Sequence, residues 1–181
     1  MLVFLQDPNR PASFLPAARY GAGLQPIFIA VSDLNRDGKL DLAVANQGSP
    51  SDATTASVSV LLQDPAAPGK FLPAVSYKTG LISVYVVIAD LNGDGKADLA
   101  VANLGGLGGS VSVLLQNPTL PGQFQPAINY DSSDLVSSVA VGDMNGDGKP
   151  DLVIAGGSGV KFRFQDAAHS GQFLAETPIT K

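Results

Sequence analysis

One pattern recurs along the chain at intervals of about fifty residues, and it restricts the fold more than any other feature. The segment Val58-Ser-Val-Leu-Leu-Gln-Asp-Pro recurs as Val111-Ser-Val-Leu-Leu-Gln-Asn-Pro. Weaker copies begin at Leu2 and at Val160. Such self-similarity is typical of architectures in which each repeat packs on its neighbours. We therefore expect a row of similar structural units.

Three independent markers share one register. The glutamines that end these segments are spaced by 57, 53 and 49 residues, and four phenylalanines repeat the same intervals. Three aspartates are spaced by 57 and 53 residues. The markers are Gln6, Gln63, Gln116 and Gln165; Phe14, Phe71, Phe124 and Phe173; and Asp33, Asp90 and Asp143. The agreement of all three indicates a genuine internal repeat.

Each unit divides into four strand-like segments separated by turn signals. In the second unit these segments are Val84–Ala89, Ala97–Asn103, Val111–Gln116 and Phe124–Tyr130. A connector rich in proline and glycine, which begins at Asn117, separates the last two. Because no segment shows a sustained 3.6-residue period with helix caps, we expect almost no helix.

Four short antiparallel strands per unit are typical of a β-propeller blade. The apolar first two strands are expected nearest the central axis, and the more polar fourth strand outside. A parallel β-helix is the competing architecture, but its repeats are shorter. We predict a single all-β domain over residues 1–181, with repeats at about 24–80, 81–133 and 134–178 and a half repeat at 1–20.

The number of repeats raises a question about closure. Propellers close with about 4–8 blades, whereas this sequence supplies three full units and a two-strand remnant, Leu2–Gln6 and Phe14–Tyr20. The sequence is a piece of a longer protein, or two chains close one ring, or the molecule is an open arc. Because exposed strand edges favour association, we expect a homodimer or a longer chain, and closure of a monomer least.

Each full unit carries a nine-residue loop between its first two strands. The loops read Asp33-Leu-Asn-Arg-Asp-Gly-Lys-Leu-Asp, Asp90-Leu-Asn-Gly-Asp-Gly-Lys-Ala-Asp and Asp143-Met-Asn-Gly-Asp-Gly-Lys-Pro-Asp. Side chains at positions 1, 3 and 5 and a backbone carbonyl at position 7 supply the hard oxygen ligands that calcium prefers. Position 6 is always glycine, which suits a conformation that other residues resist. The helix-loop-helix calcium motif has a glutamate at position 12, whereas here the further carboxylate is at position 9.

The sequence therefore predicts three calcium sites. In each, the ligands are the side chains at positions 1, 3, 5 and 9 and the backbone carbonyl of the lysine at position 7. The residues are Asp33, Asn35, Asp37, Lys39 and Asp41; Asp90, Asn92, Asp94, Lys96 and Asp98; and Asp143, Asn145, Asp147, Lys149 and Asp151. Three carboxylates within one turn would repel one another without a cation.

The choice of metal follows from the donor atoms. Oxygen ligands without histidine or cysteine argue against zinc and copper, and magnesium prefers fewer protein ligands. The alternative interpretation is that the loops are metal-free Asp-Gly turns, but three copies with the same flanking strands favour calcium. We expect the ions to be mainly structural, each clamping one hairpin.

Composition excludes several classes of protein. The net charge is −5, and nine of the 16 acidic residues lie in the three loops, so broad contact with nucleic acid is not expected. The absence of cysteine excludes disulfides and zinc–thiolate sites. No apolar run approaches the roughly 18–20 residues of a membrane helix. The first residues lack the basic start of a signal peptide, so we expect any export signal to lie outside this sequence.

The loops and their flanks resemble the FG-GAP or VCBS repeat family, whose calcium-loop blades also occur in the heads of integrin alpha subunits. The resemblance rests on Asp-x-Asn-x-Asp-Gly-x-x-Asp followed by Leu-Ala-Val-Ala, and it spans three repeats from about Leu24 to Pro178. The literal Phe-Gly and Gly-Ala-Pro words of the family are absent, and Gly122-Gln-Phe-Gln-Pro-Ala is the nearest trace. The resemblance implies an extracellular propeller, usually seven-bladed, used for adhesion or ligand binding.

Two functions remain open at this stage. The leading hypothesis is a calcium-stabilised module that recognises a protein or glycan through loops on one face, such as Gln47–Ala56 and Leu104–Ser110. The alternative is a calcium-dependent hydrolase acting on lactones or esters, in which calcium is a Lewis acid. His169 is the single histidine and is expected to be inert, so no catalytic residue is assigned. Because such loops suit millimolar calcium, we expect an extracellular or periplasmic location.

Overall fold

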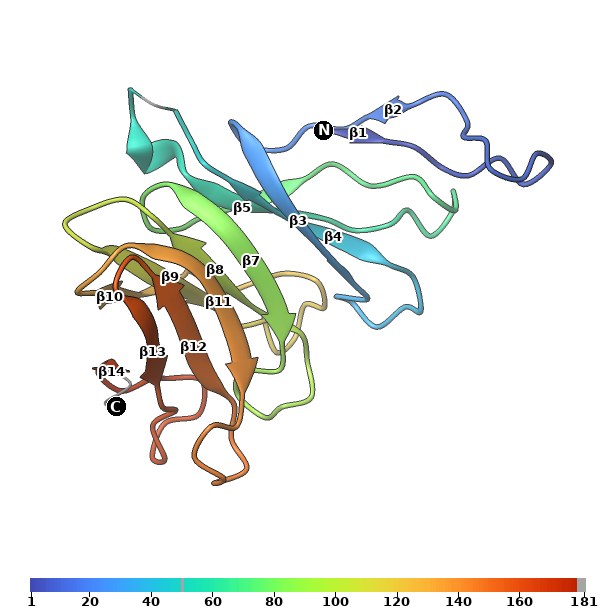
Figure 1. Ribbon diagram of the computed structural model, residues 1–181. Helices are drawn as coiled ribbons and strands as arrows, with labels where there is room; N and C mark the ends of the chain where they lie inside the picture. Colours follow the sequence, from blue (N-terminus) through green and yellow to red (C-terminus); the bar gives the residue numbers. More distant parts are fainter. Residues whose placement is uncertain (50, 179–181) are drawn as a thin grey trace.

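The chain consists almost entirely of short antiparallel strands (Figure 1). The computed structural model describes residues 1–49 and 51–178. Within this part of the chain, one 3-10 turn (η1, Ala53–Thr55) is the only helical element, and no helix is long and apolar enough to span a bilayer. The expectation of an all-β chain with almost no helix is therefore confirmed.

The strands form three four-stranded sheets and one two-stranded hairpin. In each four-stranded sheet the strands are hydrogen-bonded in the order in which they occur in the sequence. The N-terminal hairpin is β1 (Leu2–Val3) and β2 (Ala18–Arg19); the first sheet is β3 (Pro26–Ser32), β4 (Asp41–Asn46), β5 (Ser57–Leu61) and β6 (Val75–Lys78); the second is β7 (Ser83–Ala89), β8 (Asp98–Asn103), β9 (Gly109–Leu114) and β10 (Ile128–Ser132); the third is β11 (Val136–Gly142), β12 (Asp151–Gly156), β13 (Gly159–Arg163) and β14 (Thr177–Pro178).

The fourth strand of the second sheet is shorter than the sequence predicts. In the second sheet the predicted strand Phe124–Tyr130 begins only at Ile128, and Phe124 makes an isolated bridge to Gln116. The proline at position 126 has no N–H to donate, so the continuous ladder cannot pass through it. The prediction was therefore right about the existence of this strand and wrong about its start.

The sheets pack on one another through their first strands and their faces. Strands β3, β7 and β11 lie side by side in Figure 1. One hydrophobic core, which includes Leu34, Val86 and Leu99, joins the first and second sheets. A second core, which includes Leu91 and Val139, joins the second and third. Since full burial of such a side chain is worth roughly 1.5–3 kcal/mol, these shared cores hold the three sheets in a row.

The second and third strands of the first two sheets are the most deeply buried elements. Every residue of β4 and β8 is buried, because neighbouring sheets cover both faces of β8, and the second sheet and the N-terminal hairpin cover the two faces of β4. This explains why the Asp-Leu-Ala-Val-Ala-Asn segments do not alternate between apolar and polar residues. At the end of β8, Asn103 Nδ2 donates to the hydroxyl of Ser112 at 2.8 Å inside the core. Buried amides of this kind fix the pairing register, because any shift would leave them without partners.

Candidate metal centres

The three aspartate loops occupy equivalent places in the three sheets. Each connects the first strand to the second, so all three lie at the same end of their sheets. Their backbones turn alike, with left-handed residues at loop positions 4 and 6. The φ angles are 63° and 81° at Arg36 and Gly38, 77° and 79° at Gly93 and Gly95, and 78° and 80° at Gly146 and Gly148. The glycine that all three loops have at position 6 therefore adopts a left-handed conformation that other residues resist.

Side-chain oxygens at positions 1, 3 and 5 organise each loop. In the second loop, Asp90 Oδ2 accepts the N–H of Gly95 at 2.7 Å. Asn92 Oδ1 accepts the N–H of Asp94 at 2.9 Å, and Asp94 Oδ1 accepts the N–H of Lys96 at 2.8 Å. The same three bonds occur in the other loops, at Asp33, Asn35 and Asp37 and at Asp143, Asn145 and Asp147. Three oxygen-bearing side chains thus gather around one tight turn.

The aspartate at position 9 has a different environment. Asp98 is fully buried at the start of β8, and Asp41 and Asp151 are equally buried at the starts of β4 and β12. In the second loop, Asp98 Oδ2 accepts the N–H of Leu91 at 2.9 Å, and Oδ1 accepts the N–H of Gln116 at 2.7 Å. The other two aspartates accept equivalent N–H groups. Position 9 therefore ties the start of the loop to the end of the third strand.

Burial and neighbouring charge act on these carboxyls. Burial raises the pKa of Asp98 to about 6, and the negative charges of Asp94 and Asp90 act in the same direction against the hydrogen bonds from backbone N–H groups. The pKa of Asp41 is raised by the same causes. At exposed position 5, by contrast, the backbone N–H of Lys39 lowers the pKa of Asp37. The inner carboxylates are therefore the ones that nearby positive charge would stabilise most.

The donor set was tested for its fit to calcium. Across residues 1–49 and 51–178, no three His, Asp or Glu side chains converge into a group that could hold a metal ion in this conformation. The reason is geometric, because the third carboxylate of each loop is directed inward to backbone N–H groups. Besides this residue, each loop contains two carboxylates, one amide oxygen and the backbone carbonyl of its lysine. These are hard oxygen donors of the kind that calcium takes. The donor atoms of the loops therefore fit calcium in their chemistry. That the aspartate at position 9 is itself a ligand stays a prediction.

The lysines at position 7 contribute charge as well as a carbonyl. Lys96 Nζ lies 2.9 Å from Asp94 Oδ2, and Lys39 Nζ lies 3.6 Å from Asp37 Oδ2. Lys149 instead donates to the carbonyl of Ala167 at 3.1 Å. The ammonium groups of the first two loops thus neutralise part of the exposed negative charge. They leave the lysine carbonyls unaffected as donors to a cation.

The glutamine markers of the repeat turn out to have a role that sequence reasoning missed. Besides its bond to Asp98, Gln116 donates through Nε2 to the carbonyls of Ala97 and Leu34, both at 2.8 Å. Leu34 belongs to the loop of the preceding sheet. Gln165 repeats this pattern with the carbonyls of Pro150 and Leu91. The identical spacing of the glutamines was the available signal.

A tyrosine ladder was also missed. The hydroxyl of Tyr77 accepts the N–H of Phe124 at 3.1 Å, and that of Tyr130 accepts the N–H of Phe173 at 3.2 Å. The rings of each pair meet edge to face with centroids 5.7 Å apart. Each pair joins the outer strand of one sheet to the next sheet. Tyr20, Tyr77 and Tyr130 follow the intervals 57 and 53, so the sequence contained this signal too.

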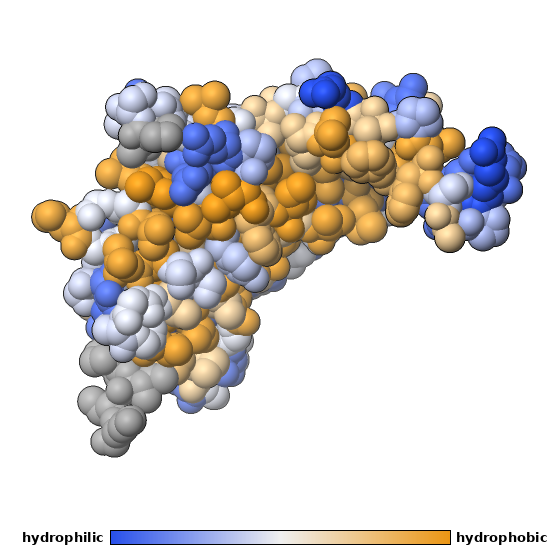
Figure 2. Space-filling model, turned by 45° about the horizontal axis from the view of Figure 1, so that its top comes forward, coloured by the Kyte–Doolittle hydropathy of each residue, from blue (hydrophilic) through white to orange (hydrophobic). Residues whose placement is uncertain are grey.

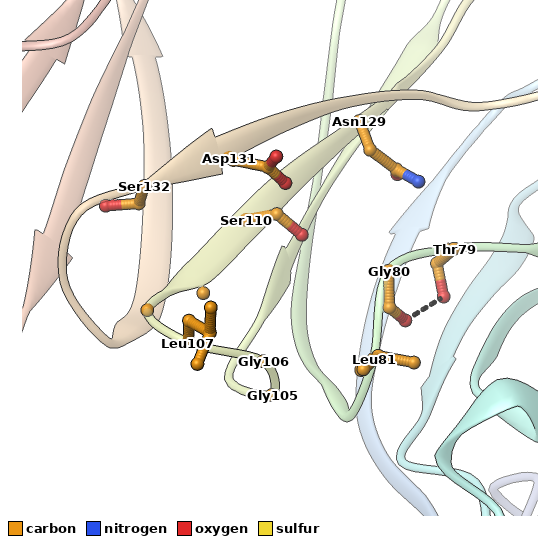
Figure 3. A pocket seen from close by; sticks show the side chains of 12 residues that line it. Thr79, Gly80, Leu81, Gly105, Gly106, Leu107, Ser110, Asn129, Asp131 and Ser132 are labelled. Atoms are coloured by element: carbon orange, nitrogen blue, oxygen red, sulfur yellow. Dashed lines mark hydrogen bonds between the residues drawn. The ribbon is translucent and has the colours of Figure 1, made fainter.

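A pocket of about 420 Å³ lies at the opposite end of the second sheet from its aspartate loop (Figure 3). It is formed by the segment before β7, the loop between β8 and β9, and the end of β10. The polar side chains shown around it in Figure 3 are Thr79, Ser110, Asn129, Asp131 and Ser132, and the apolar ones are Leu81 and Leu107. The predicted recognition loop Leu104–Ser110 therefore supplies part of a concave surface.

Glycine makes this pocket loop fit against its neighbours. A Cβ at Gly108 would collide with the backbone oxygen of Ser132, and one at Gly109 would approach the N atom of Val136 to 2.7 Å. Leu107, by contrast, is fully exposed at the tip. The other predicted loop, Gln47–Ala56, includes residue 50, which lies outside the described residues. Its described part contains η1 and does not line this pocket.

His169 lies in an exposed loop between β13 and β14. Its Nδ1 is 2.8 Å from Asp166 Oδ2, and their side chains are both solvent-accessible. The hydrogen bond with His169 is the main cause that lowers the pKa of Asp166. The pair is thus a local surface interaction within one turn. It lies on a different segment from the pocket described above.

Comparison with known proteins shows the family of the chain and a similar solved structure. A family model described as "FG-GAP-like repeat" matches residues 33–101 and 90–154. No curated protein sequence matches the chain. Among solved structures, a lectin from Agrocybe aegerita, described for its specific recognition of non-reducing terminal N-acetylglucosamine, is 17% identical with a TM-score of 0.47. The match covers 98% of this chain and 60% of the lectin chain, so the chain spans less than two thirds of that protein.

Proposed function

Because the chain belongs to the FG-GAP-like repeat family, we propose that its three aspartate loops bind calcium and that the calcium-stabilised sheets form a recognition module for a protein or glycan. The single observation that carries this proposal is the threefold repetition of one loop geometry. The same side chains accept the same backbone N–H groups at positions 5, 6 and 7 of every loop. Each copy thus gathers three side chains with the hard oxygen donors that calcium takes.

The residues that would hold each ion follow from the donor chemistry. On the second loop they are Asp90, Asn92, Asp94 and the backbone carbonyl of Lys96, with Asp98 as the inner carboxylate. A bound calcium supplies positive charge that offsets the repulsion among these groups. The chain's own residues keep the turn in shape, because the side chains already hold the backbone N–H groups. The first and third loops offer the corresponding residues.

The proposed role of calcium is structural. The loops lie at one end of the sheets, and the pocket lined by Ser110 and Asp131 lies at the other. Calcium would fix the hairpin formed by the first two strands, which builds the cores between sheets. We propose that the sheets are blades of a β-propeller, since their first strands lie side by side and each packs on the next. The ions would thus preserve the shape of a distant surface.

The proposed contact surface is the pocket in Figure 3. Its hydroxyl, amide and carboxylate groups, contributed by Ser110, Asn129 and Asp131, suit a ligand with several hydroxyl or amide groups. Leu81 and Leu107 supply apolar surface beside them. Such a mixture fits a sugar ring or a polar peptide loop. Because loops of this calcium-binding kind suit millimolar calcium, the proposed location is outside the cytoplasm, extracellular or periplasmic.

The recognition part of the proposal is tested by screening glycan and matrix-protein arrays with the full chain and with Asp131→Ala. We expect binding that the substitution abolishes, because the carboxylate is a strong acceptor in the pocket. Asp166→Ala, at an exposed loop of the third sheet, is the matched control and should bind normally. Chelation of calcium should weaken binding only as far as it unfolds the chain. Ligand binding that Asp131→Ala leaves unchanged would assign recognition to another surface.

A further inference from the structure

The first strand of the first sheet exposes an apolar face that its counterparts bury. On β3, the side chains of Ile27, Ile29 and Val31 are 48%, 44% and 54% exposed. The residues equivalent to Ile29 by the repeat intervals are Val86 and Val139, which are only 1% and 3% exposed. Figure 2 shows a broad hydrophobic area across the middle of the molecule in that view. The same position of the repeat is thus buried in the second and third sheets and exposed in the first.

The cause of this difference is the neighbour on the preceding side. Val86 packs into the core shared with the first sheet, and Val139 packs into the core shared with the second. The first sheet has only the N-terminal hairpin before it. That hairpin covers Leu42, Val44 and Leu61, against which Val3 packs. It covers the middle of the sheet and leaves the first strand open.

The hairpin also presents an open strand edge. In the sheets, the third strands β5, β9 and β13 pair with the second strand on one side and the fourth strand on the other. β1 corresponds to a third strand by the register of the glutamines, yet across residues 1–49 and 51–178 it pairs only with β2. Its other edge therefore has backbone groups available for another strand.

Gln6 indicates which residue a strand paired with the open edge of β1 should contain. In each sheet, the N–H of the corresponding glutamine donates to the position 9 aspartate of its own hairpin: Gln63 to Asp41 at 2.7 Å, and Gln116 to Asp98 at 2.7 Å. Gln6 is exposed, and in the described part of the chain no carboxylate accepts its N–H. The register therefore places an aspartate opposite Gln6.

Gln63 gives a second and independent indication. Gln116 and Gln165 both donate through Nε2 to a carbonyl at loop position 2 of the preceding sheet, Leu34 and Leu91 respectively. Gln63 Nε2 donates to Leu40 of its own sheet at 3.1 Å, and within the described residues it makes no bond to a preceding loop. The first sheet thus lacks the preceding loop that Gln116 and Gln165 bond to, and this open place lies on the same side as Ile29.

We propose that the surface formed by the open edge of β1 and the exposed face of β3 binds a β-hairpin of the same repeat type. Its second strand would pair with β1, and its first strand would cover Ile29. The aspartate at position 9 of its loop would accept the N–H of Gln6, and the carbonyl at position 2 would accept from Gln63. Every one of these contacts repeats one that occurs between the existing sheets.

A second copy of the chain is a poorer occupant. Its three hairpins of this type are each engaged by their own sheet and by a core shared with a neighbouring sheet. A second copy would have to release one of them before it could fill the surface. The proposed occupant is therefore a hairpin outside the three sheets. This inference goes beyond the proposed function, since none of the contacts involves a metal ion.

The first test uses a fluorescent synthetic peptide with the sequence of residues 81–108, which contains a complete hairpin. Its binding to the full chain is followed by fluorescence anisotropy with calcium and with chelator. We expect saturable binding that Ile29→Asp weakens by roughly tenfold or more, the factor that loss of one buried apolar side chain implies. Gln6→Pro should also weaken it, because proline removes the N–H donor. Ile128→Asp, at an equally exposed isoleucine of β10, should have no effect.

The second test removes the dependence on peptide folding. Residues 81–110 are fused directly before Met1, which reproduces the spacing between Asp98 and Gln116 for the added aspartate and Gln6. We expect the fusion to raise the melting temperature and to lower the binding of a hydrophobic dye. The same fusion with the added aspartate changed to leucine should show less of both effects. Ile29→Asp should be more harmful in the fusion than in the original chain.

Two outcomes would overturn the proposal. One is a fusion whose stability and dye binding equal those of the original chain, with peptide binding absent or insensitive to Ile29→Asp. The other is self-association of the unfused chain, measured by analytical ultracentrifugation, that Ile29→Asp abolishes and the peptide does not displace. The second result would assign this surface to another copy of the chain. Neither result depends on whether the aspartate loops bind calcium.

Discussion

At the scale of single residues, the aspartates of one loop have two separate tasks. Asp98 is buried and joins the backbone of its loop to that of β9's end through Leu91 and Gln116. Asp94 lies at the surface, and its side chain accepts hydrogen bonds from Lys96 of its own loop. A sequence that repeats both residues gives no hint of the difference. The structure separates a buried residue that joins two segments of the fold from an exposed residue that bonds within its own loop.

This separation predicts opposite effects for two similar substitutions. Asp98→Asn should destabilise the calcium-free chain by about 1–3 kcal/mol, since an amide nitrogen would face a backbone N–H in a buried site. Asp94→Asn should change calcium-free stability by roughly 0.5 kcal/mol or less and should instead weaken calcium binding. Urea unfolding in chelator and a calcium titration distinguish the two. Equal losses of calcium-free stability would show that the two aspartates are not specialised.

The roles of residues could be predicted only in part from the sequence. The loops, their spacing and their oxygen donors are visible there because the same residue types recur at fixed positions in all three copies. The inward bonds of Asp41 and Asp98 are not visible, since they depend on how a loop meets the third strand, more than fifteen positions away. The hydroxyls of Tyr77 and Tyr130 were marked by the repeat intervals, but their partners belong to another sheet.

At the scale of elements, neighbouring sheets are joined by a few directional bonds in addition to apolar cores. Gln116 bonds to its own sheet and to the preceding loop, whereas Gln63 bonds only to its own sheet. Gln116→Ala should therefore cost about 1–3 kcal/mol, because it leaves the buried carbonyl of Leu34 without its partner. Gln63→Ala should cost less. Thermal unfolding of the two variants checks this order, and a reversed order would contradict the bond between sheets.

A second set of hydrogen bonds, a tie centred on Glu176, links the residue after β10 to the segment before β14. Ser133 N and Lys161 Nζ both donate to Glu176 Oε1, at 2.8 and 3.3 Å. Burial by itself would raise the pKa of Glu176, but hydrogen bonds from Ser133 and the Lys161 ammonium outweigh it and lower the pKa from 4.5 to about 2. The carboxylate form is therefore the one that the folded chain favours.

The tie predicts a defined pH dependence. A lowered carboxyl pKa contributes stability that is complete above the unfolded value of 4.5 and is lost as the pH falls through about 2. Glu176→Gln should therefore lower stability by about 1.5 kcal/mol at pH 7, the value expected for hydrogen bonds to a charged group. The difference from the original chain should shrink between pH 4.5 and 2. Urea denaturation across this range measures it, and a constant difference would contradict the assigned cause.

At the scale of the whole molecule, the repeat explains most of what could be predicted. The 57- and 53-residue intervals give the number of units, and the alternation within each gives four strands. The predicted start of the outer strand of the second sheet was wrong because Pro126 interrupts the ladder, which a hydrophobic pattern does not register. The exposed face of β3 could not be predicted from the sequence either, since Ile29 and Val86 are equally apolar and only their neighbours differ.

The central claim is that the aspartate loops bind calcium and stabilise the sheets through it. Isothermal titration calorimetry of the full chain with calcium, beside the combined variant Asp37→Asn, Asp94→Asn and Asp147→Asn, tests it most directly. The account predicts uptake of three calcium ions per chain, loss of that uptake in the variant, and a higher melting temperature with calcium than with chelator. Absence of binding heat, together with melting that is the same in calcium and in chelator, would contradict it.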